Sequence, residues 1–208
     1  MIILGLTGSI GMGKTVAAGD FRRLGVPVHD SDAAVHRLLA KGGAAVEQVG
    51  DAFPNVVVDG AVDRAALGKV VFGDTPALRK LESILHPMVR TEKDCFLKRM
   101  ARRRVPLVVL DIPLLFETNG QVACDAVAVV SAPLRVQRQR VLARPGMTVE
   151  RFESVLNYQM SDQMKRQKAD FVIQTGLGRR HSLRQITAIV RMVSTWEGRK
   201  WPPFAARS

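Results

Sequence analysis

The sequence predicts an α/β fold, in which short apolar strands alternate with amphipathic helices around one core. Two observations at the amino terminus support this prediction. Residues 2–6 (IILGL) form an apolar run that is typical of a strand buried on both faces. The run leads into a glycine-rich turn and then into the helix-like segment TVAAGDFRRL, so a strand, a loop and a helix follow one another.

The glycine-rich turn is GSIGMGKT, and it fits the pattern G-x-x-x-x-G-K-[ST] of phosphate-binding loops. Gly8, Gly11 and Gly13 allow successive backbone N–H groups to turn inward around phosphate oxygens. Lys14 brings a positive charge to the β- and γ-phosphates of a nucleotide, and the Thr15 hydroxyl can bind Mg²⁺. A chance match is the alternative, but the preceding strand, the complete motif and the following helix all oppose it.

Length and composition limit the class of protein. A chain of 208 residues forms one domain, or one core with insertions, and 47% apolar residues are enough for a substantial core. No run approaches the length of a membrane span, and no signal segment precedes the first strand. We therefore expect a soluble, cytoplasmic protein without membrane partners. Cys95 and Cys124 lack metal-site spacing, which favours two reduced thiols.

The formal net charge of +12 leaves three interpretations open. It is compatible with nucleic-acid binding, with a site for polyanionic small molecules, or with a basic proteome. Aromatic residues make up only 5% of the chain, and no basic stretch interleaves with them as in single-strand binders. The charge therefore favours phosphorylated small ligands, and we expect no nucleic-acid partner.

Further elements follow from hydrophobic patterning. Strands are predicted at residues 26–29, 107–112, 125–130 and 169–173, and helices at residues 14–24, 33–42, 47–53, 64–72, 133–144 and 183–193. Asp63 is expected to cap the helix that starts at residue 64.

Three segments stand apart from this alternation. Residues 33–104 are largely helical, which indicates an inserted substrate-binding subdomain; within it Pro87 predicts either two helices joined near His86 or a kink. Residues 148–166 are polar and helix-like, as expected of a mobile lid. The basic tail from Gly198 onward is expected to be loosely attached.

Acidic residues after strands are the next candidates for chemistry. Asp30 and Asp32 could cap the following helix, or one of them could accept the proton of an attacking hydroxyl or hold Mg²⁺ through water. Sequence physics alone weighs these alternatives equally. Asp111 ends an apolar strand and is a candidate metal or water ligand beside the phosphate loop. Glu117 could orient a neighbouring loop.

Basic residues provide a further set of candidates. Arg140 and Arg144 could form a solvated helix face, or they could close over the triphosphate and stabilise charge on the transferring phosphoryl group. Lys165 and Arg166 are weaker candidates of the same kind. His86 is by chemistry alone a structural histidine at a helix junction, and it is retained as a substrate-binding candidate because of the motif that contains it.

Several segments together resemble the dephospho-coenzyme A kinase family. They are GLTGSIGMGKT, VPVHDSD, LHP at residues 85–87 and DIPLLFE at residues 111–117. Gln137, Arg140 and Arg144 fit the family's Q-x-x-R-x-x-x-R pattern. The closing segment is matched by Gln159, Ala169-Asp170, Val172-Ile173 and Gly176. The loop alone is generic to a large superfamily, whereas these motifs at these separations are specific, and they cover residues 2–176.

The resemblance implies a function and an architecture. The reaction is transfer of the γ-phosphoryl group of ATP, with Mg²⁺, to the ribose 3′-hydroxyl of dephospho-coenzyme A. The fold is a five-stranded parallel sheet flanked by helices, with a helical substrate-binding insertion and a lid. The family's ATP-binding loop falls on Gly11, Met12, Gly13, Lys14, Thr15 and Val16, and its proposed base falls on Asp32. Val16 departs from the family's usual Lys-Ser-Thr ending, although Thr15 keeps the metal-binding hydroxyl.

We therefore expect four regions and one main function. The nucleotide-binding core is predicted at residues 1–32, 105–144 and 167–198, the helical substrate-binding insertion at 33–104, the lid at 145–166 and the basic tail at 199–208. The predicted activity is that of a dephospho-coenzyme A kinase, working as a monomer or small homo-oligomer. Another nucleoside or nucleotide kinase of the same core is the nearest alternative, and a nucleic-acid-binding regulator with the same loop is a more distant one.

Overall fold

The computed structural model describes residues 1–202, and the part of the predicted tail at residues 203–208 lies outside them. The described chain divides into two compact units. The first comprises residues 1–29 and the chain from residue 100 onward, and the second is Asp30–Arg99. Each unit has its own core and is described by itself.

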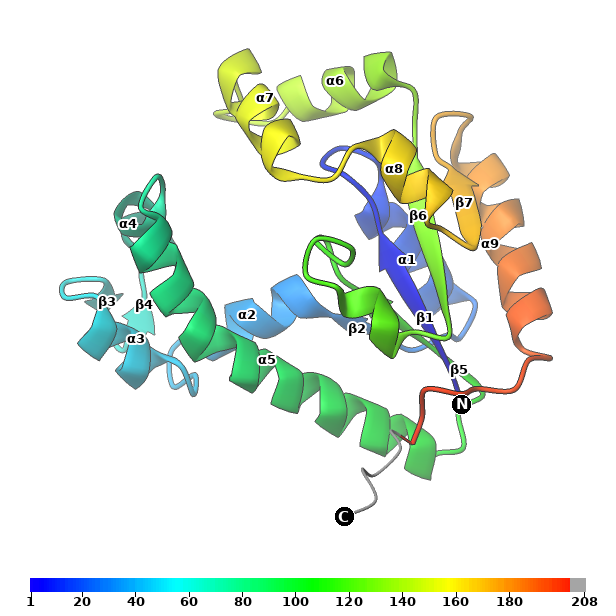
Figure 1. Ribbon diagram of the computed structural model, residues 1–208, viewed down its shortest axis with the longest axis horizontal. Coiled ribbons are helices and arrows are strands. Elements are labelled where there is room, and N and C mark those ends of the chain that lie inside the picture. The colour runs from blue at the N-terminus through cyan, green and yellow to red at the C-terminus, as the bar shows by residue number, and fades with distance from the viewer. Residues whose placement is uncertain (203–208) are drawn as a thin grey trace. The chain divides into compact units, whose positions relative to one another are not determined.

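A parallel sheet forms the centre of the first unit (Figure 1). Its five strands lie in the order β2-β5-β1-β6-β7. Their bounds are Ile2–Thr7 for β1, Val28–Asp30 for β2, Leu107–Asp111 for β5, Ala126–Ser131 for β6 and Phe171–Gln174 for β7. The predicted five-stranded parallel sheet is therefore confirmed.

Burial on both faces explains why these segments form central strands. Every residue of β1, β5 and β6 is buried, and a strand covered on both faces needs a nearly continuous apolar sequence. The register places Leu6 opposite Asp111 on β5, and Leu4 opposite Ala126 on β6. The ends of β1 and β5 therefore lie side by side at one edge of the sheet.

Helices complete the first unit. They are α1 (Lys14–Arg23), α6 (Leu134–Leu142), α7 (Val149–Tyr158), α8 (Asp162–Gln167), α9 (Arg179–Val193) and the 3₁₀ turn η1 (Gly120–Ala123). Helix α9 packs against β7 and α1. Figure 1 shows α6 and α7 beyond the end of the sheet where β1 leads into α1.

The second unit is mainly helical. It contains α2 (Ser31–Leu39), α3 (Val46–Ala52), the hairpin β3 (Val57–Val58) and β4 (Ala61–Val62), α4 (Arg64–Val71) and most of α5 (Thr75–Arg102). Asp63 caps α4 as predicted, because its side chain accepts hydrogen bonds from the backbone N–H groups of Ala65 and Ala66. The core of this unit is wholly apolar and includes Leu39, Val49 and Phe53.

Helix α5 corrects one prediction. The chain forms a single helix through Pro87, so the alternative of two helices joined near His86 is wrong. An interior proline costs about 3 kcal/mol or more, because it removes one backbone hydrogen bond and crowds the preceding turn. Leu81, Leu85 and Met88 pack into the apolar core on both sides of Pro87, and this burial outweighs the local cost.

The carboxyl-terminal segment corrects another prediction. Asp125 Oδ1 accepts hydrogen bonds from the backbone N–H groups of Arg199 and Lys200, at 2.6 and 3.0 Å, while its Oδ2 accepts one from Ile3 at 2.8 Å. The expectation of a loose tail from Gly198 onward is therefore wrong for these residues.

Within residues 1–202, no helix is long and apolar enough to cross a membrane.

Candidate active site

The phosphate loop, defined here as residues 8–15, connects β1 to α1. Gly11 and Gly13 have φ angles of +75° and +91°, which residues with a side chain rarely adopt. A Cβ atom on Gly11 would lie 2.4 Å from Val141 Cγ2, so a side chain there would also collide with α6. Helix α1 begins at Lys14 with no side-chain cap, and its first N–H groups can therefore bind an anion.

Lys14 and Asp111 form an ion pair at the end of the sheet. Lys14 Nζ lies 2.6 Å from Asp111 Oδ1, and the Asp111 side chain is only 2% exposed. The pairing of β1 with β5 explains this contact, because Asp111 lies opposite the end of β1, where the loop begins. The two sequence candidates most closely linked to phosphate and metal chemistry are thus in direct contact.

Thr15 and Val16 follow Lys14 on the first turn of α1. Both are exposed, with Val16 half-exposed at 50%. The Thr15 hydroxyl makes no hydrogen bond to any group among residues 1–202. It is therefore available as an oxygen ligand, whereas Val16 presents only an apolar surface.

The back of the phosphate loop is held by side chains from distant segments. Gln137 Nε2 donates to Ile10 O at 2.7 Å, and Ile10 N donates to Gln159 Oε1 at 3.0 Å. Thr175 Oγ1 donates to Met12 O at 2.6 Å. The loop backbone is thereby fixed at Ile10 and at Met12 by residues outside the loop.

Arg140 and Arg144 occupy different environments. The Arg140 guanidinium donates to Thr175 Oγ1 at 3.1 Å and to Thr175 O at 2.8 Å, so it supports the residue that holds Met12. Arg144 is exposed on the turn after α6, and its side chain makes no hydrogen bond or ion pair to the described part of the chain. The structure brings Arg140 toward the loop through Thr175 and leaves Arg144 unpaired.

A cavity of about 280 Å³ lies between the phosphate loop and helices α6, α7 and α8. Its walls are mainly apolar and include Met12, Leu134 and Leu156. Ser9 Oγ and Asp162 Oδ1 also belong to the lining residues and have no hydrogen-bond partner within residues 1–202. Buried polar atoms of this kind commonly bind an ordered water.

Glu117 and Lys165 form a second ion pair, in contact with Met160, which lines the cavity. Lys165 Nζ lies 2.8 Å from Glu117 Oε1, and the Lys165 side chain is fully buried. The same carboxylate oxygen accepts a hydrogen bond from Met160 N at 2.8 Å. Burial acts to raise the pKa of Glu117, but the charged contact with Lys165 and the backbone hydrogen bond from Met160 outweigh it and hold that pKa below its ordinary value.

The candidates of the second unit lie on α2 and α5. Asp30 caps α2, because its side chain accepts a hydrogen bond from Ala33 N at 3.0 Å. Asp32 lies in the first turn of α2, is exposed, and makes no hydrogen bond or ion pair within the described residues. His86 is exposed on α5. The capping role thus falls on Asp30, and the carboxylate of Asp32 remains available.

Sequence reasoning missed the residues behind the loop. Thr175 carried no signal, because a threonine after a strand is common. Gln137 and Gln159 were noted only as matches to a pattern. A usable signal was present in α6, where the polar residue Gln137 lies one helical turn before the apolar Val141 and shares its buried face.

Fold and loop together define the class of protein. A parallel sheet whose central strand leads through a phosphate loop into a helix, with the loop lysine paired to an aspartate on the adjacent strand, is the architecture of a P-loop kinase. A solved structure from Thermus thermophilus is similar to this chain, with a TM-score of 0.79, 36% identity, and coverage of 92% of this chain and 96% of that one.

Comparisons with known families identify the chain more closely. The dephospho-CoA kinase family model matches residues 2–178. The dephospho-CoA kinase of Paramagnetospirillum magneticum is 64% identical over 166 residues, which are 80% of this chain and 78% of that protein. The enzyme of the same name from Mesorhizobium japonicum is 55% identical over 190 residues, covering 91% of this chain and 95% of that protein. The chain therefore belongs to the dephospho-CoA kinase family, and the predicted family is confirmed.

One further solved structure supports the fold. The dephospho-CoA kinase from Campylobacter jejuni superposes with a TM-score of 0.63 over 93% of this chain and 98% of that one, at 21% identity. The parallel sheet and its flanking helices are therefore shared with a second member of the family.

Proposed function

We propose that this chain transfers the γ-phosphoryl group of ATP to the ribose 3′-hydroxyl of dephospho-CoA, giving CoA and ADP. Membership of the dephospho-CoA kinase family makes it an ATP-dependent phosphotransferase. The observation that carries the proposal is the Lys14–Asp111 ion pair, at 2.6 Å, at the mouth of a complete phosphate loop. This contact supports the proposal, because the positive charge of Lys14 belongs to the loop where the β- and γ-phosphates of ATP are expected to bind.

ATP binding is assigned to the phosphate loop. The residues proposed to contact it are Gly8, Gly11, Met12, Gly13, Lys14, Thr15 and Val16. Backbone N–H groups of the loop and the first turn of α1 donate to phosphate oxygens, and the helix dipole favours the same negative charge. Lys14 Nζ donates a hydrogen bond to Asp111 Oδ1 at 2.6 Å, and this contact orients the lysine side chain. When the phosphates arrive, Lys14 exchanges part of this contact for phosphate oxygens, which are equally charged partners.

We propose that Mg²⁺ binds at the same place, because residues there offer oxygen donors. The Thr15 hydroxyl and the Asp111 carboxylate are oxygen donors, and Mg²⁺ typically combines one or two such groups with water and substrate phosphates. Within residues 1–202, no group of three or more His, Cys, Asp or Glu side chains is arranged so that it could hold a metal ion. When bound, Mg²⁺ neutralises charge on the transferring phosphoryl group.

The acceptor hydroxyl is assigned to Asp32. Its carboxylate is exposed and free of the capping role, which Asp30 fills. A carboxylate in this state can accept the proton of the 3′-hydroxyl or orient its lone pair for attack. His86 is proposed to contact the same substrate, because its imidazole is exposed on α5.

The arginines are assigned to charge stabilisation. Arg144 has an unengaged guanidinium near the end of α6, and we propose that it binds the triphosphate. Arg140 uses two hydrogen bonds to fix Thr175, which leaves other donors of its five N–H groups for the transferring phosphoryl group. Catalysis then comes mainly from positioning and electrostatics, since phosphoryl transfer requires little covalent help.

The proposed setting follows the family. We propose that the protein acts in the cytoplasm as a monomer or small homo-oligomer, with ATP and dephospho-CoA as its partners and without nucleic acid. The predicted division into nucleotide-binding core, substrate-binding insertion, lid and basic tail remains part of this proposal.

The test is ADP release by the purified protein with ATP and Mg²⁺, in the presence and absence of dephospho-CoA. We expect strong stimulation by dephospho-CoA and CoA as the product. A folded protein that binds ATP but is not stimulated would contradict the assignment of the acceptor. A panel of nucleosides and nucleotides would then identify another acceptor, and salt-sensitive binding of RNA or DNA without acceptor-dependent turnover would instead indicate a regulator.

A further inference from the structure

The connection between α7 and α8 is held more firmly than a lid is expected to be. We call residues 159–165 the α7–α8 junction. Gln159 Oε1 accepts from Ile10 N at 3.0 Å, and Asp162 Oδ2 accepts from Ser131 Oγ at 2.8 Å. Met160 N and Lys165 Nζ both contact Glu117 Oε1 at 2.8 Å. The junction is thereby fixed to the phosphate loop, to the end of β6 and to the segment after β5.

Fixing a surface segment with the Glu117–Lys165 ion pair costs desolvation free energy. Lys165 is fully buried and Glu117 is 16% exposed, so both charges lose most of their hydration. Buried ion pairs contribute little net stability over apolar residues of the same size, and their best-attested use is to specify one arrangement. The pair therefore points to a role in fixing the local geometry, beyond its small net contribution to stability.

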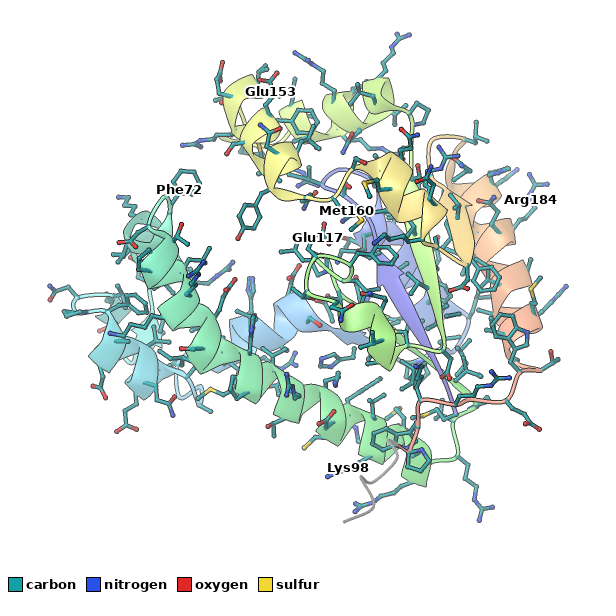
Figure 2. The ribbon with its side chains drawn as sticks, viewed as in Figure 1. Phe72, Lys98, Glu117, Glu153, Met160 and Arg184 are labelled. Carbon is teal, nitrogen blue, oxygen red and sulfur yellow. The ribbon has the colours of Figure 1, made fainter. Side chains whose placement is uncertain are left out.

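Two consecutive residues, Gln159 and Met160, link this ion pair to the phosphate loop. Glu117 holds the backbone N–H of Met160, and the neighbouring residue Gln159 accepts the Ile10 N–H. Gln137 holds the carbonyl oxygen of Ile10 from α6. Figure 2 shows Glu117 and Met160 on adjoining segments, where the chain leaves α7. Displacement of Met160 would shift Gln159 and break its hydrogen bond with the backbone N–H of Ile10.

We propose that Glu117 and Lys165 are positioning residues for the phosphate loop, acting through Met160 and Gln159 on the backbone of Ile10. This inference rests on the proposed use of the loop for ATP. The loop binds phosphate with its backbone N–H groups, so its affinity depends on how narrowly the backbone is held. The glutamate of the DIPLLFE segment, which the sequence suggested could orient a neighbouring loop, then holds the phosphate loop in its binding conformation.

The first experiment compares Glu117→Gln with Glu153→Gln. Glu153 is exposed on α7, so the second variant makes the same chemical change away from the proposed contacts (Figure 2). The dissociation constant of ADP is measured by calorimetry, and KM is measured for both substrates. We expect Glu117→Gln to weaken ADP binding and raise KM for ATP roughly three- to thirty-fold, with a smaller effect on KM for dephospho-CoA. Wild-type values in Glu117→Gln would overturn the proposal.

A double-mutant cycle tests the route through Gln159. Gln159→Leu removes the acceptor for Ile10 N while keeping a similar size. If Glu117 acts through Gln159, the double variant Glu117→Gln/Gln159→Leu binds ADP no more weakly than the weaker of the two single variants. Effects that multiply would show two independent contributions and would overturn the route.

A separate variant protects the test from misfolding. Glu117→Gln leaves Lys165 buried with no negative partner, which can prevent folding. Glu117→Gln/Lys165→Met removes both charges, and Gln159→Leu leaves the ion pair intact. A merely structural pair predicts less folded protein with normal ADP affinity in the folded fraction. A positioning pair predicts folded protein with weakened ADP affinity in each of these variants.

ADP binding needs no acceptor, so the two proposals fail separately. A wild-type protein that binds ADP but does not phosphorylate dephospho-CoA would defeat the proposed function alone, and the variants would still decide the role of Glu117. If the wild-type protein phosphorylates dephospho-CoA but every variant binds ADP with wild-type affinity, only the positioning role is contradicted.

Discussion

In the first unit ten polar or charged side chains are buried, whereas every buried side chain of Asp30–Arg99 within the described chain is apolar. The ten are Thr7, Ser9, Asp20, His29, Asp111, Ser131, Gln137, Lys165, Thr175 and Ser182. Several of them hold the phosphate loop or its lysine. In the second unit the helices and the hairpin form an apolar cluster.

This difference separates two ways of building a protein interior. Satisfied buried polar groups fix one arrangement of the chain, because any displacement leaves a donor or acceptor without a partner. Apolar cores tolerate changes of shape much better, since contacts between hydrocarbon groups have no fixed direction. The first unit therefore holds reactive groups in place with buried polar contacts, whereas the interior of the second unit is stabilised by apolar burial.

Lys14→Ala is the strongest test that the polar contacts of the first unit serve chemistry. We expect turnover to fall about 10³-fold, because the variant removes a charge that stabilises the transferring phosphoryl group. The folded state should persist, as judged by circular dichroism and thermal unfolding. Lys98→Ala, at an exposed lysine of α5, is the matched control and should keep wild-type turnover. Near wild-type turnover in Lys14→Ala would remove the loop from the mechanism.

Asp32→Asn asks whether the second unit contributes chemistry in spite of its apolar core. We expect kcat to fall about 10²-fold, because an amide cannot accept the proton of the acceptor hydroxyl. The dissociation constant of ADP should change much less. Asp63→Asn is a suitable control, because asparagine also caps a helix and the cap of α4 is retained. Equal losses of kcat and nucleotide affinity in Asp32→Asn would indicate a metal-binding or folding role instead.

Leu67→Ala tests the second unit as a purely apolar structure. Leu67 is 4% exposed in the core of that unit, and its truncation should lower the free energy of unfolding by about 2 kcal/mol or more. Urea denaturation measures this change. ADP affinity of the folded protein should remain that of the wild type, because the phosphate loop belongs to the first unit. A weakened ADP affinity would show that the two kinds of interior are not separable in function.

Acid titration gives the smallest expected effect and concerns Glu117. The pKa of Glu117 in the folded protein lies below its ordinary value, so its ion pair contributes stability that is fully present above about pH 4.3. This contribution is lost as the pH falls through the lowered pKa and the carboxylate becomes protonated. When the pH is lowered from about 4.3, the free energy of unfolding of Glu117→Gln should therefore fall less than that of the wild type. Parallel stability curves for the two proteins would contradict the assignment.

Local features of the chain were predictable from the sequence. The phosphate loop depends on residues within one short segment, and the central strands reveal themselves by continuous apolar runs. Asp111 could be placed at the end of a strand beside the loop, because parallel strands end at one edge of a sheet. The resulting contact with Lys14 agrees with that reasoning. The roles proposed for Asp32, His86, Arg140 and Arg144 stay predictions.

Features that depend on distant contacts were not predictable. Thr175 and Met12 lie 163 residues apart, and nothing near either one indicates their hydrogen bond. The burial of Lys165 is equally hidden, because a lysine in a polar segment is normally solvated. Pro87 led to a wrong prediction of two helices, because proline usually breaks a helix. Here the burial of Leu81 and Leu85 keeps the helix continuous.

The order of strands has a consequence for how cells make this protein. Strand β1 leaves the ribosome before the other strands of the sheet, yet it lies between β5 and β6 in the finished sheet. Leu4 pairs with Val109 and Ala126, so about a hundred residues are translated before either neighbour exists, which takes roughly 5 to 20 s. Asp30–Arg99 emerges in that interval and can complete its apolar core. During this interval the nascent chain exposes the apolar strand β1 without its partner strands, and we expect chaperones that act during translation to bind it.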